Sequence, residues 1–581
     1  MTGESAQLFE KSIHDDTFAL WRNKGQNERK KEAFLPFLSP TEARERALYD
    51  RAIENLGETK QLLYAYISSF QILRVFIVQY LFNNCIIKRK KKVNILYDVI
   101  VVGTGFGGMT ASALLAKKGY RTLTLEAASE LGGCAGKFER QSFRFQAGAT
   151  LGMGFEEGGV FSQLFHELDM SPPPVHLLDT IMDVHFSERT IRYYQQKERW
   201  FEEIARQFPK DSAAIVRFFE EMFSLADAML SFVYKRPIVP PKTIKHLFQA
   251  IQKADRKLIS ATPFLFQSIA KRLQHYGIRD ETFIAFLNGQ LVDSVQTTIE
   301  RCPALLGAVA LSIFHRGAFY VEGGLSNVVH TIAERYKQLG GELRMREKVV
   351  SIRKQRHWLV TTNRKQTYEA KHVVFNGSIH SIFSILDDSI KRTFSIREEK
   401  EKRRPAWGAF TIYIGADDDL QTDSLYHQFI VDRTKPMSEG NQFLLSASAP
   451  FDRQMAPVGK RSITISTHTE PLHWWNRHAY DEQKKMLTEQ ILQRVNKTFP
   501  LTNIHVQLVG TPVTFSRFTH RAFGKVGGYI PNGVFSLLST YSPQTNVEGL
   551  WLCGDTVFPG AGSLGCALSG WIVADGISAS K

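Results

Sequence analysis

Cysteine is scarce in this chain of 581 residues, and its five cysteines are scattered. They are Cys85, Cys134, Cys302, Cys553 and Cys566, and no two of them form a C-x-x-C pair. This spacing argues against a disulfide framework or a structural zinc site, so we expect a reducing compartment and no metal ion. The sequence also has no secretory signal after Met1, no internal repeat and no low-complexity tract.

Signatures of nucleic-acid binding are absent as well, although the formal net charge is +15. Without a helix-turn-helix, zinc-finger or RNA-binding motif, a basic surface points to anionic lipid instead. Hydrophobic residues make up 43% and charged residues 23%, the balance of a globular protein. We therefore expect an anionic membrane surface as a partner and no nucleic acid, while the oligomeric state stays open.

Long apolar runs are also rare, and the one that could cross a bilayer is 61–87, followed by the basic run 88–92. Arg74 near its centre costs about 2.5–3.5 kcal/mol, which makes insertion marginal. Residues 1–96 are therefore expected to be an N-terminal extension, either an anchor or a segment foreign to the catalytic domain. We expect a cytoplasmic protein that is peripheral on the membrane, with a transmembrane anchor at 61–87 as the alternative.

A nucleotide-binding signature begins at Tyr97. The run 97–102 predicts a buried parallel strand, and Gly103, Gly105 and Gly108 follow it as G-x-G-x-x-G. These glycines suit a tight turn, close approach of a pyrophosphate, and close packing of strand and helix. A helix over 109–118 and a second strand over 121–125 should follow, with Glu126 placed to bind the adenosine ribose.

Two further segments favour FAD over NAD. Gly132, Gly133 and Lys137 form a second glycine-rich cluster just after Glu126. Near the C-terminus, a predicted strand over 549–553 leads into Gly554 and Asp555, and then into a helix that begins near Ser563 and Leu564. An acid at a strand end can accept from ribityl hydroxyls, and a helix N-terminus can face the flavin. No Cys or His occupies an obvious attachment position, so we expect the FAD to be non-covalent.

Four ordered motifs resemble those of the FAD-dependent phytoene desaturases and carotenoid isomerases, a group of amine-oxidase-like flavoproteins. The motifs lie at 97–138, 320–325, 511–528 and 549–577. The resemblance implies FAD contacts by Gly103, Gly105, Gly108, Glu126, Gly132, Gly133, Lys137, Val349 and Asp555, with a backbone contact from Val349 to adenine. Desaturases of this family often carry Arg where this chain has Cys134, and the patterns around Cys134 and Asp555 look closer to isomerase-like members.

The predicted fold class is α/β. We expect a discontinuous Rossmann-type FAD-binding domain made of residues 97–158, 316–378 and 540–581. An inserted α+β substrate domain should include 379–539, and a helical, membrane-facing substrate region should occupy 159–315. Within that region, 211–234 reads as a Phe-rich amphipathic helix, and basic residues over 242–257 alternate with Ile244, Leu247, Phe248 and Ile251. That stretch is either a membrane-binding face or an ordinary solvated helix face.

The expected function is that of an FAD-dependent oxidoreductase of carotenoid biosynthesis. Its substrate would be a long acyclic isoprenoid or polyene, a C30 or C40 carotenoid precursor, and its reaction desaturation. The alternatives are a carotenoid cis-trans isomerase using reduced FAD, a terminal carotene oxygenase, an amine oxidase, and a carotenoid-binding protein without activity. His315, Arg316, His520 and Arg521 are the candidate catalytic residues, although a hydrogen-bonded structural side chain is the favoured interpretation of each.

Overall fold

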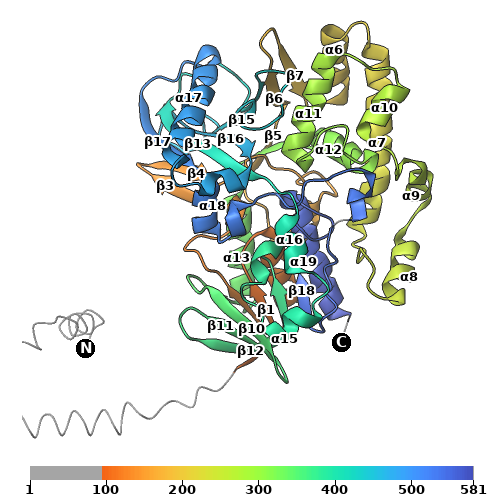
Figure 1. Cartoon of the computed structure of the whole chain (residues 1–581), viewed down its shortest axis with the longest axis vertical. Helices are drawn as coiled ribbons and strands as arrows, with labels where there is room; N and C mark the ends of the chain where they lie inside the picture. The colour runs from red at the N-terminus through yellow and green to blue at the C-terminus, as the bar shows by residue number, and fades with distance from the viewer. Residues whose placement is uncertain (1–94, 539, 580–581) are drawn as a thin grey trace, which may run out of the picture. The chain divides into compact units, whose positions relative to one another are not determined.

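The computed structural model describes residues 95–538 and 540–579 (Figure 1). The predicted N-terminal extension and the apolar run 61–87 lie outside these residues. Within the described part of the chain, no helix is long and apolar enough to cross a membrane.

The first sheet is built from three segments that are far apart in the sequence. Its strand order is β10-β11-β12-β1-β2-β9, and β18 pairs with β12. The strands are β1 (Leu96–Val102), β2 (Thr122–Leu125), β9 (Glu342–Arg344), β10 (Val349–Lys354), β11 (Trp358–Thr362), β12 (Thr367–Phe375) and β18 (Leu550–Leu552). Parallel pairing joins β1 to β2 and β12, whereas β10, β11 and β12 form an antiparallel ribbon. The sheet is therefore mixed.

Four helices pack together in the core on one side of this sheet: α4 (Phe106–Lys117), α5 (Val160–Glu167), α13 (Ser326–Gln338) and α19 (Gly562–Ser578). α4 begins three residues before the predicted start, because Gly105 has extended backbone and serves as its N-cap. α4 and α19 approach closely: a β-carbon added at Gly570 would lie 2.0 Å from the carbonyl oxygen of Gly107. The last helix of the chain is thus fitted against the first helix of the nucleotide-binding unit.

The second sheet has the order β17-β13-β16-β15-β14-β6-β7. Its strands are β6 (Thr180–His185), β7 (Thr190–Tyr194), β13 (Gly408–Asp417), β14 (Tyr426–Ile430), β15 (Gln442–Ala447), β16 (Lys460–Thr469) and β17 (Ile504–Gly510). Pairing is antiparallel except between β6 and β14. One face packs against α17 (Tyr480–Thr498), and residues of the opposite face pack among the helices that occupy most of 197–316.

A helical layer accounts for most of 197–316. It comprises α6 (Lys197–Gln207), α7 (Ser212–Tyr234), α8 (Ile244–Lys253), α9 (Arg256–Ser260), α10 (Ile269–His275), α11 (Glu281–Val295) and α12 (Ala304–Arg316) (Figure 1). The prediction of a helical region over 159–315 was incomplete, because β6 and β7 leave it to join the second sheet. Phe218 and Phe219 of α7 are fully buried, so this half of the Phe-rich helix forms core.

Candidate functional site

The glycine motif forms a cradle in which side chains have no room. Gly103 has φ +97°, and Gly105 caps α4. A β-carbon added at Gly108 would lie 2.1 Å from the carbonyl oxygen of Gly103. The N-terminus of α4 therefore opens onto bare backbone, which is the arrangement that a pyrophosphate requires.

Asn376, at the end of β12, completes this cradle, and the sequence analysis did not identify it. Its backbone nitrogen donates to the Val102 carbonyl at 2.9 Å, and its side-chain Nδ2 donates to the Gly103 carbonyl at 3.4 Å. A β-carbon at Gly105 would lie 3.0 Å from that Nδ2. An Asn-Gly pair directly after a buried strand was the available signal. The Asn376 side chain thus fixes the turn that the glycines make.

Glu126 lies at the end of β2, beside the first turn of the motif. Its Oε2 accepts from the Thr104 backbone nitrogen at 2.9 Å and from the Thr104 hydroxyl at 2.6 Å, and its Oε1 accepts from the Ala128 nitrogen at 2.8 Å. Val349, the first residue of β10, lines the same cavity as Glu126. The predicted adenosine-binding residues therefore come together at one end of the cavity.

The second glycine cluster continues from this end. Gly132 has φ +100° and Gly133 has φ +57°, and the Gly132 nitrogen donates to the Thr104 hydroxyl at 3.3 Å. Lys137 begins β3 (Lys137–Arg140) and also lines the cavity. Burial lowers the pKa of Lys137, with a smaller contribution from Arg144. The two glycine clusters are thus joined through Thr104.

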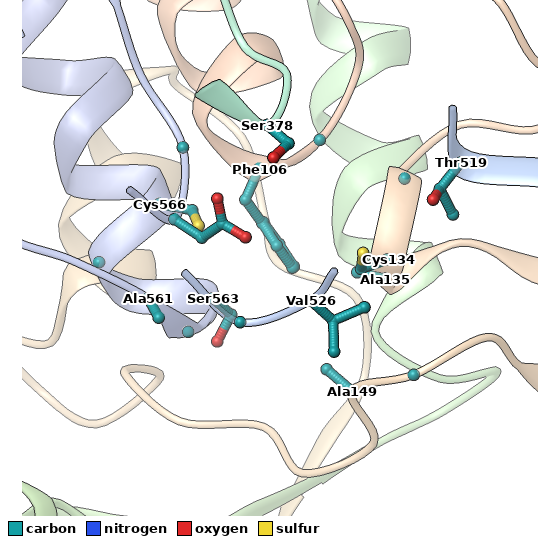
Figure 2. A pocket seen from close by; sticks show the side chains of 18 of the residues that line it. Phe106, Cys134, Ala135, Ala149, Ser378, Thr519, Val526, Ala561, Ser563 and Cys566 are labelled. Carbon is teal, nitrogen blue, oxygen red and sulfur yellow. The ribbon is translucent and has the colours of Figure 1, made fainter. Parts of the chain in front are cut away.

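The C-terminal motif lies in the same cavity. Gly554 follows β18 with φ +111°, and its nitrogen donates to the Ser569 hydroxyl at 2.9 Å. Asp555 forms an ion pair with Arg521, and both side chains are largely buried. Ser563 and Leu564 lie in the first turn of α19, whose N-terminus borders the cavity. In Figure 2, side chains from distant segments, among them Phe106, Cys134, Val526 and Ser563, surround one space.

These residues fit FAD. The cradle offers two helix N-termini, backbone without side chains over the two glycine clusters, and a carboxylate at each of two strand ends, Glu126 and Asp555. Helix N-termini stabilise phosphate, and carboxylates accept hydrogen bonds from ribose and ribityl hydroxyls.

The cavity extends from the cradle into an apolar chamber, and its total volume is about 1710 Å³. That exceeds the usual range of about 300–1,000 Å³ for a small-molecule site. The second sheet contributes one wall and α7 and α12 contribute another. Chamber-lining residues include Met229, Leu230, Leu305, Val309, Ile313, Thr411, Tyr413, Leu444, Ser466 and His468. Asp293 of α11, which the sequence analysis also missed, lines the chamber too.

The four candidate catalytic residues separate in the structure. His315 lies in the helical core, where its Nδ1 is 2.9 Å from the Gln195 carbonyl oxygen, and burial lowers its pKa to about 4. It does not line the described cavity, and neither does Arg316, which pairs with Asp227. Placing these two beside the flavin is therefore corrected, because the end of α12 carries them toward α7 and the end of β7.

His520 and Arg521 do line the cavity, but at the cradle. Burial lowers the pKa of His520. Lys348 lowers this pKa further, and Glu126 opposes the shift. Arg521 is held by Asp555 and also donates to the Lys525 carbonyl. Both positions suit cofactor binding better than proton transfer to a substrate.

Relatives of this chain match about four fifths of its length. The prolycopene isomerase of Daucus carota is 25% identical over 501 residues, covering 83% of this chain and 80% of that protein. The 4,4'-diapophytoene desaturase (4,4'-diapolycopene-forming) of Methylomonas sp is 21% identical over 498 residues, covering 80% and 92%. Wild-type putrescine oxidase bound to putrescine has a TM-score of 0.58 at 14% identity, covering 84% of this chain and 99% of that one, which shows the fold.

The family match agrees with the assignment of the cradle to FAD. The model of the flavin containing amine oxidoreductases matches residues 106–578. The predicted resemblance, the FAD cofactor and the class of FAD-dependent oxidoreductase are thereby confirmed. This chain belongs to the family of flavin containing amine oxidoreductases.

Proposed function

We propose that this protein is an FAD-dependent oxidoreductase of carotenoid biosynthesis that desaturates a long acyclic isoprenoid or polyene, a C30 or C40 precursor. The observation that carries the proposal is the apolar chamber continuous with the FAD cradle. Its walls are mostly aliphatic, and a long hydrocarbon has few polar groups for a site to recognise. The named relatives, a prolycopene isomerase and a diapophytoene desaturase, support a polyene.

Bound FAD supplies the acceptor for hydride from a carbon–carbon single bond. The chain's own residues would do the rest. Gly103, Gly105 and Gly108 hold the pyrophosphate, Glu126 holds the adenosine ribose, and Asp555 receives the ribityl chain. The aliphatic walls of the chamber between the second sheet and α12 would disfavour water beside the reacting carbons.

A redox-neutral cis-trans isomerase is the second candidate. It is favoured by the 25% identity to a prolycopene isomerase over 83% of this chain, against 21% for the desaturase. Cys134 stands where many desaturases carry Arg, which supports the same alternative. Terminal oxygenation and amine oxidation are weaker candidates, since the two sequence relatives named above are an isomerase and a desaturase.

Product mass separates these activities. The protein should be expressed in cells that make acyclic C30 or C40 polyenes, and the pigments analysed by mass and by isomer. Desaturation lowers the mass by two hydrogens per step, isomerisation leaves it unchanged, and oxygenation raises it. If the FAD-loaded protein changes neither the mass nor the isomer composition of the pigments in C30-producing and C40-producing cells, the proposed substrate class is refuted.

We also infer that α8 and α9 bind the cytoplasmic, anionic face of a membrane. The apolar side chains there are exposed: Ile244 by 75%, Phe248 by 61%, Ile251 by 58% and Ile259 by 63%. Lys242, Lys245, Arg256 and Lys257 are exposed beside them. Apolar side chains next to cations suit an anionic bilayer surface, which leaves the polyene a dry route.

The route into the chamber supports this inference. Leu258, Ala261 and Leu265 line the cavity, while Ile259 and Phe266 of the same segment are exposed. The segment therefore has one side toward the chamber and the other toward the surroundings. A substrate leaving the bilayer at α8 and α9 would reach the chamber without crossing water.

Charge reversal tests this surface. Lys253 is unsuitable because it donates to the Arg236 carbonyl at 3.0 Å, so the variant combines Lys242→Glu, Lys245→Glu and Lys257→Glu. Each cation contributes about 1 kcal/mol at an anionic surface, so co-sedimentation with phosphatidylserine vesicles should weaken at least tenfold. The matched control replaces Arg477, Lys485 and Lys497 by Glu; equal loss in both variants would show a nonspecific charge effect.

The domain division that we propose keeps the predicted segments. Residues 97–158, 316–378 and 540–581 would form the FAD-binding domain, since β1, β2, β9–β12 and β18 come from them. The segments 159–315 and 379–539 would form the substrate domain, with α8 and α9 as its membrane-facing part.

A further inference from the structure

Asp293 is an acid in a chamber that is otherwise mainly aliphatic. It lies near the C-terminal end of α11, and it lines the cavity together with Met182, Leu305, Val309 and Leu444. The Asp293 side chain is half-buried by its exposed surface area, because part of it faces the chamber. Protein atoms nevertheless surround the side chain. An ionised carboxyl in such a setting raises the free energy of the folded protein unless another group pairs with its charge.

The hydrogen bonds to Asp293 come from neutral groups. Gln428 Nε2 donates to Oδ2 at 2.5 Å, and Gln442 Nε2 donates to Oδ1 at 2.9 Å and to Oδ2 at 3.0 Å. Gln290 Nε2 donates in turn to Gln428 Oε1 at 2.9 Å, which turns the Gln428 amide NH₂ toward the carboxyl. These amides fix the direction of the Asp293 carboxyl. They do not neutralise it, and among the described residues no cation is a cause of its pKa shift.

Asp293 is also linked along its helix to a residue that contacts the segment 526–527. Gln296 is one helical turn further on, caps α11, and lines the same cavity. The Gln296 side chain lies against Gly527, where an added β-carbon would overlap it. Val526, the neighbour of Gly527, faces the cofactor space in Figure 2. Asp293 thus lies three residues before Gln296, whose side chain lies against Gly527.

We propose that Asp293 is the catalytic carboxylate that faces the positive charge formed on the polyene and accepts the proton that the polyene loses. The inference rests on the proposed function. One C–H bond breaks and its electron pair leaves with the hydride for FAD, so the carbon left behind is a cation. The adjacent C–H bond then gives its proton to the Asp293 carboxylate, and its electron pair becomes the new double bond. A fixed negative charge in a dry chamber stabilises such a cation far more than it would in water.

The first test measures binding, and it does not depend on turnover. Holoprotein is titrated with three probes of equal chain length: a long-chain alkylamine, the matching alcohol and the matching alkane. Wild type should bind the ammonium probe at least tenfold more tightly than Asp293→Asn does, while both proteins bind the alkane equally. An ammonium affinity that is the same in both proteins would overturn the proposal.

The second test measures flavin reduction in a single anaerobic turnover with an acyclic polyene. Asp293→Asn should keep its FAD and slow the bleaching of the flavin absorbance by about 10²–10⁴-fold. Asp293→Glu should recover part of the rate, and Asp388→Asn, on the exposed first turn of α15 (Asp388–Thr393), should match wild type. Equal rates for wild type and Asp293→Asn would refute the role of Asp293.

The two tests also separate the two proposals. If wild type fails to reduce its flavin with any polyene, the proposed function fails, but the ammonium preference still reports on Asp293. If Asp293→Asn does not fold, both measurements are made on Asp293→Glu instead. If this variant shows neither ammonium preference nor activity, the role of Asp293 is structural alone.

Discussion

Removing the charge of Asp293 should stabilise the protein while it impairs the reaction. Burial raises the pKa of Asp293 from 3.8 to about 6, although the amides of Gln428 and Gln442 oppose the shift. A folded-state pKa above the unfolded value means that folding favours the protonated carboxyl. The stability of the folded state is therefore highest below the unfolded pKa, and it falls as the pH rises from about 4 to about 6.

The size of the effect follows from the shift. Each pKa unit corresponds to about 1.4 kcal/mol, so the raised pKa costs about 3 kcal/mol once the carboxyl is ionised. The Asp293→Asn variant has a neutral amide at this position and would escape this cost. We expect the difference in unfolding free energy between Asp293→Asn and wild type to grow by about 2.4 kcal/mol between about pH 4 and pH 7.5.

Urea unfolding of both FAD-saturated proteins at several pH values measures this difference. Other titrating groups are common to the two proteins, so their contributions cancel in the comparison. A difference that stays constant with pH would refute the reasoning, because it would mean that the ionised Asp293 is not desolvated in the folded protein. A pH-dependent gain in stability, paired with slower flavin reduction, would identify a carboxylate retained at the expense of stability.

Four further outcomes are expected. Glu126→Gln removes a charged acceptor worth about 1.5 kcal/mol, so FAD affinity measured by titration should fall about tenfold; an unchanged affinity would exclude Glu126 as the ribose ligand. Gly108→Ala should abolish FAD binding, since its methyl group would overlap the Gly103 carbonyl, and an FAD-loaded variant would contradict the cradle geometry. Acid precipitation should release all flavin into the supernatant, whereas a yellow pellet would show covalent attachment. Vesicle binding by wild type should weaken in high salt without vanishing, because apolar side chains of α8 contribute to it; complete loss would leave charge as the sole attraction.

The cofactor cradle was predictable because its signals are local. Gly103, Gly105, Gly108 and Glu126 fall within one strand-turn-helix-strand unit, where short-range sterics decide the backbone. Asn376 was only partly predictable: the Asn-Gly pair after a predicted strand marks the position. Its partners Val102 and Gly103 lie far away in the sequence, and only the pairing of β12 with β1 brings them together.

The environments of the candidate catalytic residues also depend on contacts between segments that are far apart in the sequence. His315 was a candidate catalytic residue, but its ring contacts Tyr193 and Phe223 on the helical side. Asp293 carried no signal in the sequence, since a single acid in an amphipathic helix resembles a solvated residue. Its position depends on β14 and β15, which supply Gln428 and Gln442 from another part of the chain.

The close packing of α19 against α4 has a consequence for folding during synthesis, because α4 leaves the ribosome before α19. β18 and α19 are synthesised long after β1 and α4, yet they supply Gly554, Asp555 and a helix N-terminus to the cradle. A nascent chain that already contains Gly103–Gly108 therefore holds an unfinished nucleotide site with the packing surface of α4 uncovered. The complete cofactor site forms only after β18 and α19 have been synthesised, and until then that surface is a target for chaperones and for aggregation.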